Sequence, residues 1–187
     1  MSLSKTYLLF AFAGCFLLHA CANDPAKVKA FTRDDRQPVQ TAHDVDMLYT
    51  DSAKLKIHIT SPQVKDFAGS KPYTEMPEGV KVEFFDDAQT VNSYLTSNYA
   101  IRKQREQQTE ARNDVVVVNI KGEKLNTEKL IWDEAKHRIY TDAFVKITTK
   151  DQVLMGNGLD SDESFTNYEI KDITGSFTLK DPDKKQP

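Results

Sequence analysis

The sequence predicts an all-β fold in which antiparallel strands form a sandwich, a barrel or a roll. Between Leu125 and Thr174, short runs rich in β-branched and aromatic residues alternate with turn residues, and the turns recur about every ten to twelve positions. We expect these turns at residues 133–136, at 150–151 and at 156–158, where Gly156 and Gly158 are structural turn residues. No nucleophile, metal-cluster or phosphate-loop motif interrupts this stretch, so we expect the function to lie in the sheet itself.

The first 20 residues have the features of a secretory signal peptide. They carry one lysine, Lys5, and no acidic residue, and an apolar run follows from Tyr7 to Leu18. The run is too short and too interrupted for a membrane-spanning helix, which needs about 20 apolar residues. We therefore predict a signal peptide at residues 1–20.

Residues 18–21, with the sequence LHAC, resemble a bacterial lipobox, which predicts lipidation of Cys21. Two or more acyl chains on that cysteine suffice for stable membrane anchoring, whereas one is marginal. Cys15 is a rival site, but cleavage there would leave an apolar Phe-Leu-Leu segment exposed on the mature chain. A disulfide is the alternative role for two cysteines in an exported chain. A mature chain that begins at Cys21 has no second thiol to pair with.

Residues 21–40 are predicted to be a lipid-anchored linker, because they are polar and contain two prolines. As a flexible coil this segment would span roughly 25 Å. Residues 41–178 form the predicted β domain, and we expect residues 179–187 to be a disordered tail. Loss of the signal peptide moves the net charge from −3 to −4, because Lys5 is its only charged residue. A mildly acidic domain without a basic patch argues against nucleic acid as a partner.

The β domain is expected to open with a hairpin that has one buried face. Val45, Met47 and Tyr49 alternate with polar residues, a turn follows at residues 50–52, and apolar and polar residues alternate again up to Ile59. Pro62 is expected to close the second strand, because proline donates no hydrogen bond to the ladder. The less regular stretch from 64 to 77 is predicted to be a strand end and a loop.

Three further patterns follow along the chain. Residues 80–84 alternate cleanly, and residues 91–101 fit a two-residue period that places Tyr99 and Ile101 on the same face as Leu95. Residues 102–112 are good helix formers, but they lack an apolar stripe. We therefore favour two polar strand ends that meet at a turn near residue 106. Residues 115–120 are apolar on both faces, which predicts a central strand covered on both sides.

The chemistry-bearing residues do not form a catalytic or metal-binding pattern. The sequence contains no P-loop, dinucleotide-binding, zinc-protease, CxxC or nucleophile-elbow motif. His43 near Asp44 and Asp46 could hold a metal, but exposed strand residues explain this spacing as well. The acidic residues from 160 to 163 lack the ligand spacing of a known calcium loop, which favours a solvated turn. Trp132 either packs in the core or contacts a ligand. We predict a protein that is not an enzyme and that has no cofactor or metal.

Several stretches together resemble the LptC family of lipopolysaccharide export, in its lipoprotein form. After the lipobox and CAND, these are RDDRQPVQTAHDV, LYTDSAKLKIHITSP and MPEGVKVEFFD. Farther on are EARNDVVVVNIKGEKLNTEKLIWDEAKHRIYTDAFVKI and GNGLDSDESF. The resemblance covers nearly the whole mature chain. Better-known members hold the inner membrane with a transmembrane helix, whereas this chain would use acyl chains on Cys21, so the anchoring leaflet stays open.

The resemblance implies a twisted, open β-jelly roll of two antiparallel sheets, like that of the LptA proteins, with an apolar groove between the sheets. It implies a periplasmic protein, anchored by lipid to the inner membrane of a Gram-negative bacterium. Such a protein accepts lipopolysaccharide from inner-membrane ABC transporter subunits and passes it to a periplasmic LptA-like β-roll protein for outer-membrane assembly. Its partners would add strands to the two free edges of the roll.

Two sets of residues follow as candidates for these roles. The lipid-groove candidates are Val82, Phe84, Tyr99, Ile101, Val115, Val117, Ile139 and Val145. The partner-edge candidates are Val45, Met47, Tyr49, Tyr168, Ile170 and Ile173. The alternative for the first set is a closed core. In that case the protein is a structural, bridging lipoprotein with a closed β-sandwich that binds partners but no lipid.

Overall fold

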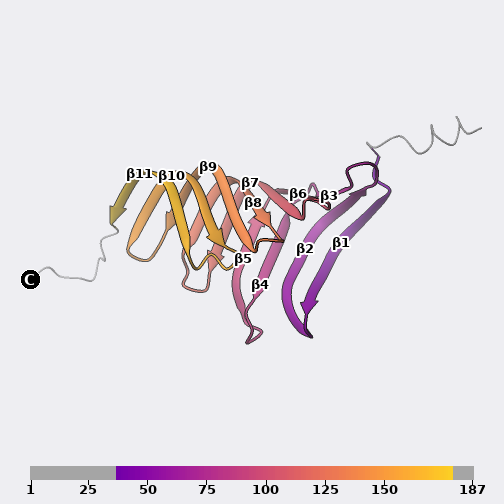
Figure 1. Cartoon of the computed structure of the whole chain (residues 1–187), viewed down its shortest axis with the longest axis horizontal. Helices are drawn as coiled ribbons and strands as arrows, with labels where there is room; N and C mark the ends of the chain where they lie inside the picture. Colours follow the sequence, from indigo (N-terminus) through magenta and orange to yellow (C-terminus); the bar gives the residue numbers. More distant parts are fainter. Residues whose placement is uncertain (1–36, 179–187) are drawn as a thin grey trace, which may run out of the picture. The chain divides into compact units, whose positions relative to one another are not determined.

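The computed structural model describes residues 37–178, and these residues form a β-structure with no helix. Eleven strands follow one another along the chain (Figure 1). They are β1 (Gln40–Asp51), β2 (Lys54–Phe67), β3 (Tyr73–Met76), β4 (Val80–Phe85), β5 (Val91–Ser97), β6 (Tyr99–Lys103), β7 (Gln108–Asn119), β8 (Lys124–Asp133), β9 (Arg138–Thr148), β10 (Gln152–Asp162) and β11 (Tyr168–Thr178). The predicted signal peptide, Cys21, most of the linker and the tail at 179–187 lie outside the described residues.

All pairings in the sheet are antiparallel, which confirms the predicted fold class. The strands form one sheet that runs from β1 to β11. The first half of β2 pairs with β4 and its second half with β3, while β7 divides in the same way between β6 and β5. The pairs β3–β4 and β5–β6 therefore each act as one long strand with an irregularity in the middle. The sheet is a simple meander of long strands.

These irregularities fall on a single line across the sheet. Beginning at β1, the line passes Asp44, Pro62, Gly79, Asn98, Asn113–Asp114, Glu128, Ala143, Gly158 and Lys171. Several of these positions have positive φ angles, including 50° at Asp44, 97° at Gly79 and 80° at Gly158. On this line β7 and β9 each contain an extra residue relative to a neighbouring strand, which bends a strand locally. At Asp44–Pro62 and Gly158–Lys171 the ladder is interrupted without a change of register. The aligned irregularities therefore fold every long strand into two halves, and we call this alignment the fold line.

The two halves of each strand belong to two layers that face each other. The first layer contains β4, β5 and the strand halves that pair with them, and the second layer contains β3, β6 and the halves that pair with those. Phe84 of β4 lies in the first layer and Trp132 of β8 in the second. Their rings meet edge to face with centroids 5.3 Å apart. Asn119 in the first layer donates a hydrogen bond of 2.7 Å to the carbonyl oxygen of Phe165 in the loop that ends the second layer. The two predicted sheets are thus the two halves of the same bent strands, and one buried cluster of side chains fills the space between them.

Buried hydroxyl groups beside the fold line satisfy backbone carbonyls that the bends release from the ladder. Ser61 donates to the carbonyls of Gln63 and Gly79, both at 2.8 Å. Thr127 donates to the carbonyl of Phe144 at 2.8 Å. A buried carbonyl without a partner is costly, so these hydroxyls explain why polar residues occur among the inward-facing side chains.

The structure corrects two predictions that assumed short strands. Pro62 does not close its strand, because β2 continues to Phe67. Pro62 lies on the fold line, where β2 has left its pairing with β4 and has not yet met β3. Residues 156–158 are likewise not a chain-reversing turn but lie inside β10. Glycine is needed there for the bend and for close approach to β11, since a Cβ at Gly156 would collide with the carbonyl oxygen of Asp172.

Two other strand predictions had different outcomes. The polar strand ends around residue 106 are confirmed, because β6 ends at Lys103 and β7 begins at Gln108. The prediction that residues 115–120 are covered on both faces is wrong. Val116 and Val118 are only half-buried, and Ile120, just after β7, is 62% exposed. The roll covers the inner face of β7 and leaves its outer face uncovered.

Candidate functional site

The inner face of the first layer carries a continuous row of apolar side chains. Residues at matching register positions on neighbouring strands form it: Met47, Ile59, Val82, Leu95, Val117, Leu125, Ile147 and Leu154. Neighbouring strands lie 4.7–4.9 Å apart, so this row extends roughly 33 Å across the sheet. The row crosses the strands from β1 to β10, which is the direction that joins the two edges of the sheet.

The second layer opposes this row with smaller residues in its middle. Ala100 on β6 pairs with Ala111 on β7, which pairs with Leu130 on β8, and all three are at most 3% exposed. Farther toward the C-terminal edge, Leu159 pairs with Ile170. The interior between the layers is therefore filled with apolar side chains along most of its length, and we call this apolar interior the groove.

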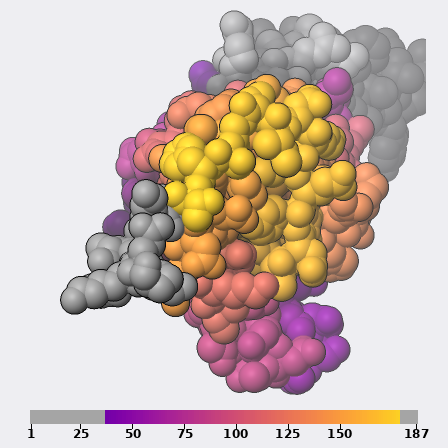
Figure 2. Space-filling view, turned by 90° about the vertical axis from the view of Figure 1, so that its left-hand side faces the viewer, coloured from indigo at the N-terminus to yellow at the C-terminus, as the bar shows by residue number. Residues whose placement is uncertain are grey.

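The apolar side chains of the groove are most exposed near the N-terminal edge. Tyr49 on β1 pairs with Ile57 on β2, and both side chains are on the inner face of the first layer. Tyr49 is 60% exposed, Met47 is 39% exposed, and Ile57 and Ile59 are only half-buried against the core. Figure 2 looks onto the opposite end, where β11 lies in front and the purple and magenta β1–β2 and β4–β5 segments project below it. The apolar row is therefore accessible at β1, enclosed from Val82 to Ile147, and half-buried at Leu154 on β10.

Six of the eight lipid-groove candidates lie in the buried cluster, each at most 6% exposed: Val82, Phe84, Val115, Val117, Ile139 and Val145. Tyr99 and Ile101 do not lie there. Asn98 adds one residue at the fold line between β5 and β6, so the alternation shifts and Ala100 takes the inward position. A one-residue slip moves every later side chain to the other face. The prediction that Tyr99 and Ile101 point inward is therefore wrong.

On the outer face, Tyr99 belongs to a polar cluster. Its hydroxyl donates a hydrogen bond of 2.7 Å to Glu75, and the guanidinium of Arg112 lies 5.9 Å from its ring centroid. Partial burial, followed by the bond to the Glu75 carboxylate, raises the pKa of Tyr99 to about 12. Arg112 also donates a bond of 2.9 Å to Glu110, which holds the pKa of that carboxyl below its usual range. This cluster fixes the outer surface of β3, β6 and β7.

The strands that carry the partner-edge candidates are the two end strands of the sheet. β1 has only β2 as a neighbour, and β11 has only β10. The six candidates divide by exposure. Met47, Tyr49 and Ile173 are exposed, whereas Val45, Tyr168 and Ile170 are half-buried against the core. Leu48 and Phe177 are further exposed apolar side chains on these strands, at 63% and 50%.

A histidine with two carboxylates ties β1 to the sheet. His58 on β2 forms hydrogen bonds of 2.9 Å from Nδ1 to Glu83 on β4 and from Nε2 to Asp46 on β1. Lys81 approaches the other oxygen of Glu83 at 2.7 Å. The bond to Glu83, and then that to Asp46, raises the pKa of His58. The sequence offered His43, near Asp44 and Asp46, as a metal candidate with simple exposure as the alternative. His43 is exposed, and the strand register brings His58 to Asp46.

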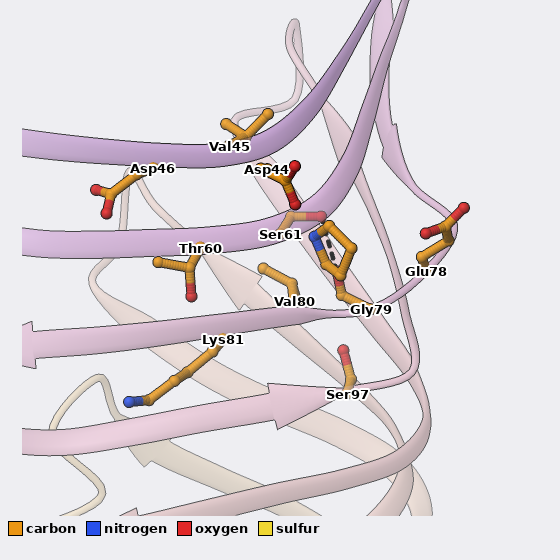
Figure 3. A pocket seen from close by; sticks show the side chains of 11 residues that line it. Asp44, Val45, Asp46, Thr60, Ser61, Glu78, Gly79, Val80, Lys81 and Ser97 are labelled. Atoms are coloured by element: carbon orange, nitrogen blue, oxygen red, sulfur yellow. Dashed lines mark hydrogen bonds between the residues drawn. The ribbon is translucent and has the colours of Figure 1, made fainter.

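An open hollow of about 490 Å³ lies at the fold line where β1, β2 and β4 bend (Figure 3). Ser61, Gly79 and Val80 lie at its centre, and Asp44, Asp46 and Glu78 stand around it. Its polar groups do not include a nucleophile with a neighbouring base. Among residues 37–178, no cluster of three or more histidine, cysteine or acidic side chains could hold a metal ion. The same residues include no helix long and apolar enough to span a bilayer.

One comparison with known proteins identifies the family. The family model described as "Lipopolysaccharide-assembly, LptC-related" matches residues 6–174. The chain belongs to the LptC family. Membership in the LptC family makes it an envelope component of lipopolysaccharide transport with a β-jelly roll, in a family of transport proteins rather than enzymes. A comparison with curated proteins finds no match.

Sequence reasoning missed one element of the site, the loop from Glu163 to Asn167. Phe165 in this loop is fully buried in the core cluster, although polar residues surround it in the sequence. Its φ angle is 52°, in a region that a bulky side chain rarely adopts. A single aromatic residue within a polar turn was the one sequence feature that could have indicated this burial.

Proposed function

We propose that this LptC-family protein accepts lipopolysaccharide at the β1 end of the groove and passes it toward β11. The observation that carries the proposal is the apolar row along the inner face, which is accessible at Met47 and Tyr49 on β1 and runs to β10, the neighbour of the other edge strand. Acyl chains would lie between the two layers, and the polar head group would stay outside. The donor is an inner-membrane ABC transporter, and the acceptor is a periplasmic LptA-like β-roll protein.

The energetics of an apolar groove suit passive transfer. Burying an acyl chain of about a dozen carbons gives on the order of 10 kcal/mol of gross stabilisation, at ~0.8 kcal/mol per methylene. A protein without an energy source of its own cannot reverse such binding. Transfer therefore requires an acceptor with a similar groove, so that the free energy changes little between carriers. Unpaired backbone groups on β1 and β11 allow such partners to extend the sheet and align their grooves.

Anchoring at Cys21 is part of the same proposal. Acyl chains on that cysteine and the linker up to residue 40 would hold the domain close to a membrane, within roughly 25 Å for a flexible coil. The inner membrane is the proposed location, because the transporter that supplies the lipid is there. The signal peptide at residues 1–20 would direct export.

Photocrosslinking provides the test, and the structure supplies matched controls. A photoreactive amino acid replaces Val82 or Val117 on the inner face, or Tyr99 or Ile101 on the outer face, and the purified chain is irradiated with rough lipopolysaccharide. The proposal expects crosslinks at the inner positions and none at the outer positions. Equal capture at both sets, or capture only outside, would contradict a lipid site between the layers.

A second candidate function has its own supporting observation. The interior is densely packed, since Val115, Leu125, Val145 and Leu159 have no exposed surface. Such packing is typical of a closed sandwich that bridges partners without binding lipid. In that case no inner position would crosslink to lipopolysaccharide, while exposed positions on β1 and β11 would still crosslink to protein partners.

A further inference from the structure

We propose that residues Glu163–Asn167 form a lid over the C-terminal half of the groove and that Phe165 occupies the place of an acyl chain. The lid connects β10 to β11 (Figure 1). This inference rests on the proposed function, because it assigns regulation to the same groove. The lid must move before lipid can reach the β11 end of the groove.

The lid crosses from the second layer to the first. It leaves β10 and returns to β11 in the second layer, yet its backbone is held by side chains of the first. Ser93 on β5 donates to the carbonyl of Glu163 at 3.3 Å, and Asn119 on β7 donates to the carbonyl of Phe165 at 2.7 Å. The two layers are joined to each other at the fold line. The lid therefore connects them again on the side of the roll away from that line.

The Glu163 side chain fastens the lid to the neighbouring strand ends. Trp132 on β8 donates a bond of 2.6 Å from its indole nitrogen to Glu163, and His137 lies 3.1 Å from the other carboxylate oxygen. These bonds link side chains that are far apart in the sequence. A small displacement of the lid would break them together.

The surface under the lid explains why a cover is needed there. Trp132, Ile139, Ser161 and Tyr168 occupy matching register positions along the free margin of the second layer. The same row is polar nearer the N-terminal edge, where Thr74, Arg102 and Thr109 continue it. The margin is therefore largely apolar only where the lid covers it.

Phe165 fills this apolar space. Its side chain has no exposed surface, and its ring stacks on Tyr168 with centroids 4.8 Å apart. A hydrocarbon chain and a phenyl ring gain stabilisation from burial in the same way, roughly in proportion to the apolar area removed from water. An incoming acyl chain can therefore take the place of Phe165 with little net change in buried apolar area.

The lid has a preformed structure that allows it to move as a unit. Asp162 accepts hydrogen bonds from the backbone N–H groups of Thr166 and Asn167, at 2.8 and 3.0 Å, and Ser161 donates to the carbonyl of Asn167. These bonds lie within the base of the loop, so opening need not disturb them. The φ angle of 52° at Phe165 indicates backbone strain that the closed position maintains.

The test compares lipopolysaccharide affinity among variants of the full chain, with rough lipopolysaccharide as the probe and displacement of a labelled lipid as the readout. Phe165→Ala removes the internal occupant, and we expect binding about tenfold tighter than wild type, because less of the protein is in the closed state. Phe67→Ala is the control, since Phe67 is also a buried phenylalanine that stacks on a tyrosine, Tyr73, but it lies outside the lid and outside the core cluster between the layers.

Ser93→Ala provides a milder variant that keeps Phe165. It removes one bond to the lid, and we expect binding about threefold tighter for the same reason. Ser97→Ala is its control, because Ser97 is also buried on β5 but donates to the carbonyl of Tyr99 instead. This pair remains informative if Phe165→Ala fails to fold.

The outcomes separate the two proposals. Tighter binding by Phe165→Ala and Ser93→Ala, and not by their controls, supports the lid. If the wild type binds saturably and the lid variants bind no tighter than their controls, the lid is refuted and the groove remains. If no variant binds, the proposed function fails and the lid with it.

Discussion

Replacing Gly156 by alanine should destabilise the C-terminal edge of the roll. A Cβ at this position would collide with the carbonyl oxygen of Asp172 and lie 2.5 Å from Cγ2 of Ile170. Asp172 belongs to the ladder between β10 and β11, so its carbonyl can yield only if β11 shifts. Overpacking of this kind typically lowers the free energy of unfolding by about 1–3 kcal/mol. Because the clashing atom belongs to the backbone and cannot rotate away, we expect a loss of about 3 kcal/mol.

Gly122→Ala is the matched control for this variant. Gly122 has a φ of 78°, but a Cβ there would meet no atom within 4 Å. Its expected cost is only the backbone strain, about 1 kcal/mol. Urea unfolding followed by far-UV circular dichroism would measure the loss in free energy of unfolding for each variant. In a thermal scan, the melting temperature should fall by about 9 °C for Gly156→Ala and about 3 °C for Gly122→Ala. Equal losses would refute the close contact between β10 and β11.

Three further outcomes are expected. Val117→Thr places a hydroxyl on the inner apolar row and should weaken lipopolysaccharide binding about tenfold in native mass spectrometry, whereas Val116→Thr on the outer face should not; equal effects would contradict a ligand on the inner face. The two carboxylate partners of His58 raise its pKa above 6.5, so its stabilising contribution is complete below that pH and is lost as the pH rises through the raised value. The difference in free energy of unfolding between wild type and His58→Gln should therefore be largest near pH 6 and narrow toward pH 9, and a difference that grows with pH would contradict the hydrogen-bonded cluster. Cys21→Ser should abolish incorporation of labelled palmitate and release the protein from membranes, whereas Cys15→Ser should not; the reverse result would move the anchor to Cys15.

The fold class could be predicted because it depends on local patterns. Two-residue alternation and evenly spaced turns identify antiparallel strands wherever they occur. The end strands were also predictable once the meander was assumed, since the first and last strands of a meander have free edges. Of the two roles that the sequence left open for Trp132, the structure shows core packing, and its contact with Phe84 joins the two layers.

The bends were not predictable from one segment at a time. Pro62, Asn98 and Gly158 are residue types that end strands or reverse the chain in most sheets. Strands of about five to six residues are typical, so Pro62 and Gly158 were interpreted as boundaries, although each lies inside a strand. Asn98 was instead included in one uninterrupted alternation from 91 to 101, although it separates β5 from β6. Only the pairing of all the strands places the three residues on one line. The faces of Tyr99 and Ile101 were predicted wrongly for the same reason, because the face depends on a single inserted residue.

The lid shows a further limit of sequence patterns. Phe165 lies in the polar stretch DESFTN, where neither alternation nor helical spacing marks it as buried. Its burial results from contacts with Asn119 and Tyr168 that exist only when both layers are in place. Side chains that fill a space between two layers are determined by the shape of that space. A residue able to yield its position to a ligand is therefore visible in the packing and not in the periodicity.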